Sequence, residues 1–182
     1  VIKLVRYHIK RPYIISFLGS FLGRTMGALS LTASKAKQRL HFSPFLPGVH
    51  HVPYGYCYRC PYNLTYGSCG IYCAEAIEKV VCKTLMSPRE IAAIFVEPIQ
   101  GEGGYILPPL EFHRKLKAFA EKNGIIYVVD EVQSGMGRTG KFLAIENFGV
   151  EPDVVVLAKG LASGLPLGAA PMAYVLWPRF MR

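Results

Sequence analysis

Four short runs of apolar residues, rich in β-branched side chains, constrain the fold more than any other feature of this sequence. They lie at residues 13–17, 91–96, 125–129 and 154–158. None of them alternates regularly with polar residues, which predicts strands that are buried on both faces. Amphipathic helical patterns at 75–85 and 110–122 lie between some of these strands. The sequence therefore predicts an α/β fold with a mostly parallel sheet and flanking helices.

The composition agrees with a packed chain and argues against two classes of partner. The 182 residues are 51% hydrophobic and 18% charged, which is enough apolar material for the core of one domain. No apolar run is long enough to span a bilayer. The net charge of +9 comes from scattered Lys and Arg, without the basic run typical of a nucleic-acid-binding segment. We expect a cytoplasmic protein with no nucleic-acid or membrane partner.

Polar residues follow three of the predicted strands, where parallel sheets bind ligands. Residues 97–104 hold two carboxylates, an amide and three glycines, Asp130 ends the third strand, and Lys159 follows the fourth. A lysine beside an apolar strand is costly to bury as an ammonium, and a neutral amine is a good nucleophile. Asp130 and Lys159 are the pair that pyridoxal phosphate (PLP) needs, because the lysine forms an imine and the acid protonates the ring nitrogen. The pair therefore predicts a PLP site, although a lysine that follows a strand can also reach solvent at the strand end.

Five blocks of the sequence resemble the class III aminotransferases, a group of fold-type I PLP enzymes that includes the 4-aminobutyrate and ornithine aminotransferases. The resemblance covers roughly residues 2–169 and implies part of the large, PLP-binding domain. The blocks are residues 20–25, 47–49, 96–104, 130–140 and 158–168.

The resemblance implies roles in cofactor binding for four residues. Lys159 forms the imine with PLP and carries the proton between the substrate carbon and the cofactor. Asp130 pairs with the pyridine nitrogen, Gln133 bonds near the phenolic oxygen, and Phe21 stacks on the ring.

Three further residues are implied at the substrate side. Arg24 binds the substrate carboxylate through its planar guanidinium, as in relatives that use ω-amino acids. Glu102 masks an active-site arginine when no α-carboxylate is bound, and Glu97 supports the polar network beneath these groups. Leu22 departs from the pattern, since the family usually has His or Trp there.

The function implied by the resemblance is PLP-dependent transfer of an amino group from an amino acid, such as 4-aminobutyrate, to a 2-oxo acid. The partners are then an amino donor, a 2-oxo acid and, for a full-length parent, a second copy in a homodimer. An amino-acid racemase or epimerase of the same family is one alternative. A non-catalytic fragment, or a zinc-stabilised binding module, is another.

The resemblance also predicts that residues 1–182 are a partial large domain, lacking an N-terminal segment and a C-terminal small domain. Such a fragment is expected to bind PLP weakly. Residues 43–73, rich in Pro, Gly, Tyr and Cys, are expected to form an irregular excursion, and residues 170–182 an atypical tail.

Four cysteines cluster within the predicted excursion, with the spacing Cys57-x2-Cys60-x8-Cys69-x3-Cys73. Four thiolates are enough ligands for tetrahedral zinc. Disulfides and free thiols are the other two states that this spacing allows, and the sequence leaves all three open.

Overall fold

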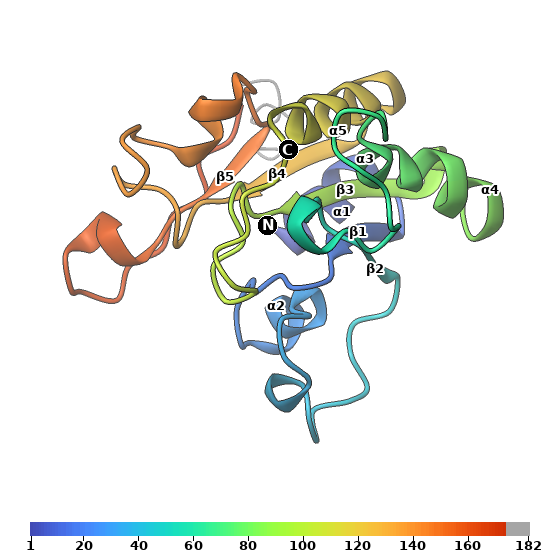
Figure 1. Ribbon diagram of the computed structural model, residues 1–182. Helices are drawn as coiled ribbons and strands as arrows, with labels where there is room; N and C mark the ends of the chain where they lie inside the picture. Colours follow the sequence, from blue (N-terminus) through green and yellow to red (C-terminus); the bar gives the residue numbers. More distant parts are fainter. Residues whose placement is uncertain (174–182) are drawn as a thin grey trace.

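A computed structural model, which describes residues 1–173, has one five-stranded sheet at its centre (Figure 1). The strand order is β2-β1-β3-β4-β5, and every neighbouring pair is parallel. The predicted α/β class with a parallel sheet is confirmed. The strands are β1 (Tyr13–Phe17), β2 (Val49–Val52), β3 (Ile91–Val96), β4 (Ile126–Asp130) and β5 (Val154–Val156).

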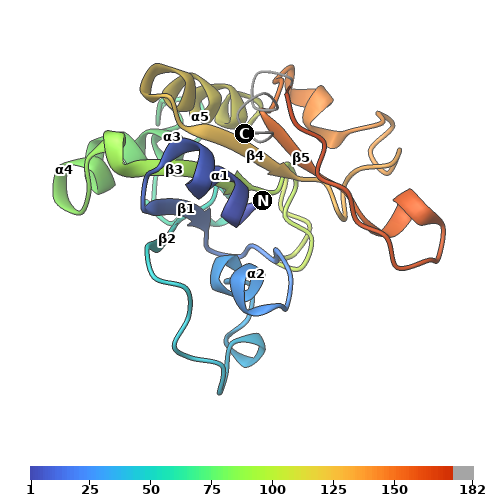
Figure 2. The same cartoon turned by 180° about the vertical axis from the view of Figure 1, so that it is seen from behind.

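Helices cover both faces of the sheet (Figures 1 and 2). The helix α1 lies on one face, and α5 packs with α3 on the other. The α-helices are α1 (Ile2–Ile9), α2 (Met26–Leu31), α3 (Tyr72–Ala76), α4 (Cys82–Thr84) and α5 (Leu110–Asn123). Short 3₁₀ helices occupy Ala36–Gln38, Cys57–Arg59, Pro88–Glu90, Ala144–Phe148 and Lys159–Ala162.

The helix α5 forms as its sequence pattern predicts. Phe112, Leu116 and Ala120 recur at four-residue spacing, and all three are fully buried against the sheet. The helix ends at Gly124, whose φ of 61° is the left-handed conformation that glycine adopts without steric cost. The buried face of this helix therefore packs against the sheet and fixes the distance between the two.

The register of the parallel strands brings the predicted site residues to one edge. Val96 lies opposite Val129 in the pairing of β3 with β4, and Asp130 lies opposite Val156 in the pairing of β4 with β5. The loops that follow β3, β4 and β5 therefore leave the sheet side by side. The loop after β3 extends toward α2 in both views (Figures 1 and 2).

The four predicted strands are present, with β4 shifted by one residue and β5 ending two residues earlier than predicted. The strand β2 was missed, because it lies inside the stretch 43–73 that was predicted to be irregular. Its residues are Val49-His50-His51-Val52, too short and too polar to be recognised. Backbone pairing with β1, from Ile14↔Val49 to Phe17↔Val52, makes it a strand.

The predicted helix 75–85 is interrupted by a π-helix at Ile77–Val81. Its apolar face was predicted to contain Ile77, Val80, Val81 and Leu85. Ile77 and Val81 are buried, but Val80 and Leu85 are exposed. The wider π turn changes the angle between successive residues, so the three- and four-residue spacing no longer marks one face.

Part of the predicted atypical tail pairs with the sheet. Leu157 N donates to Ala169 O at 2.8 Å, and Val155 N donates to Pro171 O at 2.9 Å. Residues 169–172 thus run antiparallel to β5. The rest of that predicted tail, 174–182, lies outside the described residues. Within residues 1–173, no helix is long and apolar enough to cross a membrane.

The π-helix provides a matched pair of substitutions. Val81→Ala removes two buried methyl groups and should lower the free energy of unfolding by about 1–3 kcal/mol. Val80→Ala, at a side chain that is 44% exposed, should change it by less than about 0.5 kcal/mol. Urea denaturation of both variants measures the difference. Equal losses would mean that the helix is regular here.

Candidate active site

A cavity of about 550 Å³ lies beside the ends of β4 and β5. Three segments line it: the loop after β3, the loop after β4 and the start of the 3₁₀ helix Lys159–Ala162. Its lining residues are Ile99, Gly101, Tyr105, Val132, Gln133, Ser134, Gly135, Arg138, Thr139, Lys159 and Gly160. Two of the predicted cofactor-binding residues, Gln133 and Lys159, therefore share one cavity.

Asp130 lies at the end of β4 with its carboxyl group buried. One oxygen, Oδ1, accepts a hydrogen bond of 3.0 Å from Val132 N. The pKa of Asp130 is raised to about 7, mainly by burial and in smaller part by the Glu97 carboxylate, against the lowering effects of the Val132 hydrogen bond and of Lys159. The site therefore holds a carboxyl group whose negative charge lacks full compensation, and a cationic group beside it would be stabilised.

Glu97 is buried at the end of β3 and joins two segments of the site. Its Oε1 accepts from Phe21 N at 2.7 Å, and its Oε2 accepts from Gly101 N at 3.0 Å. Burial raises the pKa of Glu97, while these two hydrogen bonds and Lys159 lower it. The Glu97 carboxylate therefore holds the backbone at Phe21 and at Gly101, which gives a definite geometry for its predicted support role.

Gln133 packs directly against the loop after β3. A Cβ atom added to Gly101 would lie 2.2 Å from Gln133 Oε1, a distance that no side chain tolerates. Glycine at 101 is therefore required for the amide of Gln133 to reach its place at the cavity wall.

Lys159 is exposed, so the lysine reaches solvent after the strand and is not buried. The strand β5 ends at Val156, and the chain turns outward into the 3₁₀ helix Lys159–Ala162. The backbone of Lys159 has φ 47°, a left-handed conformation that is strained for any residue with a Cβ. The amine lies at the cavity rim, close enough to Asp130 to affect its pKa.

Phe21 and Arg24 lie on the segment between β1 and α2, with the guanidinium carbon 5.8 Å from the centre of the Phe21 ring. Glu102 is exposed and forms an ion pair of 2.8 Å with Lys35. That hydrogen bond lowers the pKa of Glu102, and Lys159 and Arg24 lower it further. Arg24 is therefore near enough to Glu102 to affect its pKa, but neither residue lines the cavity of about 550 Å³.

Sequence reasoning missed three residues of this site: Lys35, Val132 and Tyr105. Lys35 lies outside the predicted strands and helices, so no pattern marked it as a partner of Glu102. Val132 could have been found, because it lies between Asp130 and Gln133 within a recognised block and lines the cavity. Tyr105 follows the glycines 103 and 104, and its φ of 52° turns the chain at the cavity mouth.

The four clustered cysteines line a separate cavity of about 20 Å³, which has room for about one water molecule. All five cysteines are free thiols. Zinc is not supported, because residues 1–173 contain no group of three or more His, Cys, Asp or Glu side chains placed to hold a metal. Burial raises the pKa of Cys57, and that of Cys73 to about 11, so both thiols keep their protons at neutral pH.

Comparison with known proteins decides the family. The sequence profile described as aminotransferase class-III matches residues 1–174. The chain belongs to the class III aminotransferases. Its parallel sheet with flanking helices is the fold of PLP-dependent transaminases, which confirms the expected fold type.

Relatives in this family carry two kinds of name. The chain is 43% identical over 168 residues to a leucine/methionine racemase of Thermococcus litoralis, and 44% identical over 168 residues to an acetylornithine aminotransferase of Methanopyrus kandleri. These alignments cover 92% of this chain, but only 38% and 37% of the two relatives. The crystal structure of an (S)-enantioselective omega-transaminase from Thermomicrobium roseum is 33% identical with a TM-score of 0.90, and the match covers 99% of this chain and 41% of that one.

Asp130 generates a prediction about pH. Between pH 3.8 and about 7 the folded chain keeps a proton on Asp130 that the unfolded chain loses, so this group lowers stability as pH rises through that window. One pKa unit corresponds to about 1.4 kcal/mol, so the full cost above pH 7 is about 4 kcal/mol. Asp130→Asn should therefore raise the free energy of unfolding of the cofactor-free chain by about 2–4 kcal/mol at pH 8 and by little at pH 4.

The matched control is Asp153→Asn. Asp153 accepts from Tyr127 N at 2.7 Å and pairs with Lys117 at 2.8 Å, so this change should lower stability at pH 8. Denaturation at both pH values measures each effect. A destabilised Asp130→Asn variant at pH 8 would contradict our account of the Asp130 environment.

Proposed function

We propose that the parent enzyme of this chain transfers an amino group from an amino acid to a 2-oxo acid with the help of PLP. The observation that carries the proposal is the position of Asp130 and Lys159 after the neighbouring strands β4 and β5, with Lys159 close enough to lower the pKa of Asp130. Lys159 lines the cavity of about 550 Å³, whereas Asp130 lines a second cavity of about 350 Å³. Family membership supports the same activity. An acidic residue and an amine at neighbouring strand ends are what this cofactor needs.

The residues present fit PLP. The carboxyl group of Asp130 is buried without a full counter-charge, and a protonated ring nitrogen would supply that charge. The cavity of about 550 Å³ is large enough for the cofactor together with a small substrate. When bound, PLP supplies an electron sink that stabilises negative charge on the substrate carbon.

Four side chains would hold the cofactor or move the proton. Lys159 Nζ would hold the cofactor covalently and carry a proton to and from the substrate carbon. Gln133 would bond near the phenolic oxygen, Phe21 would cover the ring, and Asp130 would hold the proton on the ring nitrogen.

The residues proposed for the substrate end of the site include a positive side chain, Arg24, and a negative one, Glu102. Arg24 is exposed and offers a planar fork for a carboxylate, which supports an ω-amino acid such as 4-aminobutyrate as amino donor. Glu102, already paired with Lys35, would take up an arginine when no α-carboxylate is present. A homodimeric assembly of the parent stays a prediction from the resemblance, and a cytoplasmic location stays a prediction from the sequence composition.

Covalent attachment to Lys159 tests the proposal. The purified chain is mixed with PLP, its absorbance spectrum is recorded, borohydride is added, and the labelled peptide is mapped. We expect the label on Lys159 and its loss in Lys159→Ala. The control is Lys83→Ala on α4, which lies at the opposite end of the molecule from the Lys159–Ala162 helix and should leave the label unchanged (Figure 1). Label spread evenly over surface lysines would contradict the proposal.

A racemase is the second candidate, and the 43% identity to the leucine/methionine racemase favours it. Both reactions remove a proton from the carbon that bears the amino group, but a racemase returns it to the opposite face of that carbon. The PLP-loaded chain is incubated with one enantiomer of leucine and 2-oxoglutarate, and the products are separated on a chiral column. Aminotransfer predicts 4-methyl-2-oxopentanoate and glutamate, whereas racemisation predicts the other enantiomer without glutamate.

A further inference from the structure

A chain of buried hydrogen bonds reaches Pro98, just after the end of β3, where the loop 97–104 begins. His113, fully buried on α5, has its Nδ1 2.8 Å from the hydroxyl of Tyr127 on β4. Its Nε2 is 2.9 Å from the carbonyl oxygen of Pro98. No step of the proposed reaction uses these groups, yet they connect α5, β4 and the segment that follows β3.

The partners of His113 determine its tautomer. The Pro98 carbonyl can only accept a hydrogen bond, so Nε2 must carry the proton. Nδ1 is then the unprotonated nitrogen, and it accepts from the Tyr127 hydroxyl. Burial lowers the pKa of His113 to about 4, so the ring stays neutral at physiological pH. A neutral imidazole with one donor and one acceptor is fully satisfied here.

Tyr54, which follows β2, contacts the same segment at Glu97 and Pro98. Its buried hydroxyl lies 3.0 Å from both Glu97 O and Pro98 O, so its single proton is shared between these two carbonyl oxygens. The Pro98 carbonyl therefore accepts from the His113 ring and shares the proton of the Tyr54 hydroxyl with Glu97 O.

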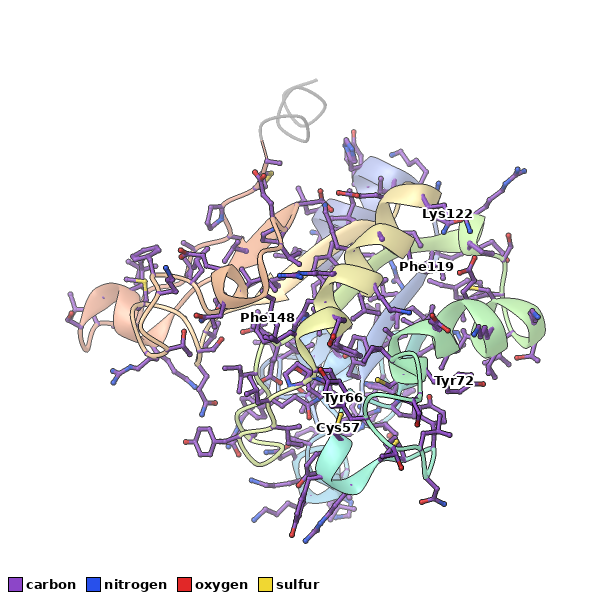
Figure 3. All side chains as sticks on the ribbon, turned by 45° about the horizontal axis from the view of Figure 1, so that its top comes forward. Cys57, Tyr66, Tyr72, Phe119, Lys122 and Phe148 are labelled. Atoms are coloured by element: carbon purple, nitrogen blue, oxygen red, sulfur yellow. The ribbon has the colours of Figure 1, made fainter. Side chains whose placement is uncertain are left out.

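Aromatic rings fix these donors in place. The His113 ring packs edge-on against Phe148 at 4.5 Å and against Phe112 at 5.3 Å between ring centres. Phe112 in turn contacts Tyr54 at 5.0 Å. Figure 3 shows Phe148 beside α5, with Phe119 toward the C-terminal end of that helix. The donors thus belong to a packed aromatic cluster with little freedom to shift.

The segment they hold determines where the Glu97 carboxylate lies. That carboxylate accepts from Phe21 N and Gly101 N, and Gly101 contacts Gln133. We propose that His113, held in one tautomer by Tyr127, is a positioning residue that places Glu97 and, through it, the Phe21 and Gly101 backbones at the cofactor cavity. That this cavity holds a cofactor rests on the proposed function, but the placement of Glu97 by His113 does not.

Two substitutions separate positioning from simple filling of the core. His113→Leu fills the space with an apolar side chain and removes both hydrogen bonds. His113→Gln keeps one acceptor for Tyr127 and one donor for Pro98, because a primary amide offers both. A residue that only fills the core would tolerate leucine at least as well as glutamine.

Amide hydrogen exchange, measured by NMR on the cofactor-free chain, tests whether His113 positions the Phe21 and Gly101 backbones. In His113→Leu we expect the protection of the Phe21 and Gly101 amides to fall by about tenfold or more, since each donates to a charged acceptor. His113→Gln should restore most of it. The Ile14 and Glu131 amides, which donate to Gly48 O and Val156 O, should keep their protection in both variants.

Unchanged protection of Phe21 and Gly101 in His113→Leu would overturn the proposal, and so would equal losses in the leucine and glutamine variants. If His113→Leu loses protection at every amide, the ¹⁵N spectrum of His113 in the unmodified chain decides. A protonated Nε2 and an unprotonated Nδ1 support the proposal, and the opposite tautomer overturns it. A parallel titration with PLP keeps the two proposals distinguishable: failure of the unmodified chain to bind PLP counts against the proposed function and leaves the exchange result valid.

Discussion

The parallel pairing of β3, β4 and β5 is the constraint on which the rest of the structure depends. It brings the carboxyl ends of three strands to one edge, and the chain places an acidic residue at two of them, Glu97 and Asp130. Acidic side chains at the edge of an apolar sheet must be compensated by nearby donors. The loops after these strands are therefore organised as much by the need to satisfy carboxylates as by packing.

Three buried acids at this edge are compensated to different degrees. Glu97 receives two backbone N–H groups, and Glu131 receives the Ser134 hydroxyl at 2.6 Å and Ile145 N at 2.8 Å. Among residues 1–173, Asp130 receives a hydrogen bond from Val132 N alone. The two well-compensated acids stabilise loops, whereas the third keeps a local cost that a bound cation could relieve. This is the pattern expected where stability is sacrificed for binding.

Local sequence patterns predicted the elements whose side chains alone decide their conformation. The strands β1 and β3 are short apolar runs, and the helix α5 has a regular apolar period. Asp130 lies at the end of β4, as the strand pattern predicted, while the roles of Asp130 and Gln133 stay predictions. Features that depend on distant partners were not predictable. The strand β2 exists through pairing with β1, and the π-helix Ile77–Val81 shifts its face through backbone geometry. The hydrogen bonds of His113 join residues from three separate segments, which no local pattern reveals.

The antiparallel pairing of residues 169–172 with β5 has a consequence for aggregation. Unpaired edges of sheets are templates to which other chains add strands. Among residues 1–173, the tail segment occupies one edge of this sheet, and β2 forms the other. Strand addition at the β2 edge is therefore limited to four residues, two of which are histidines. Short edges are a common protection against such growth.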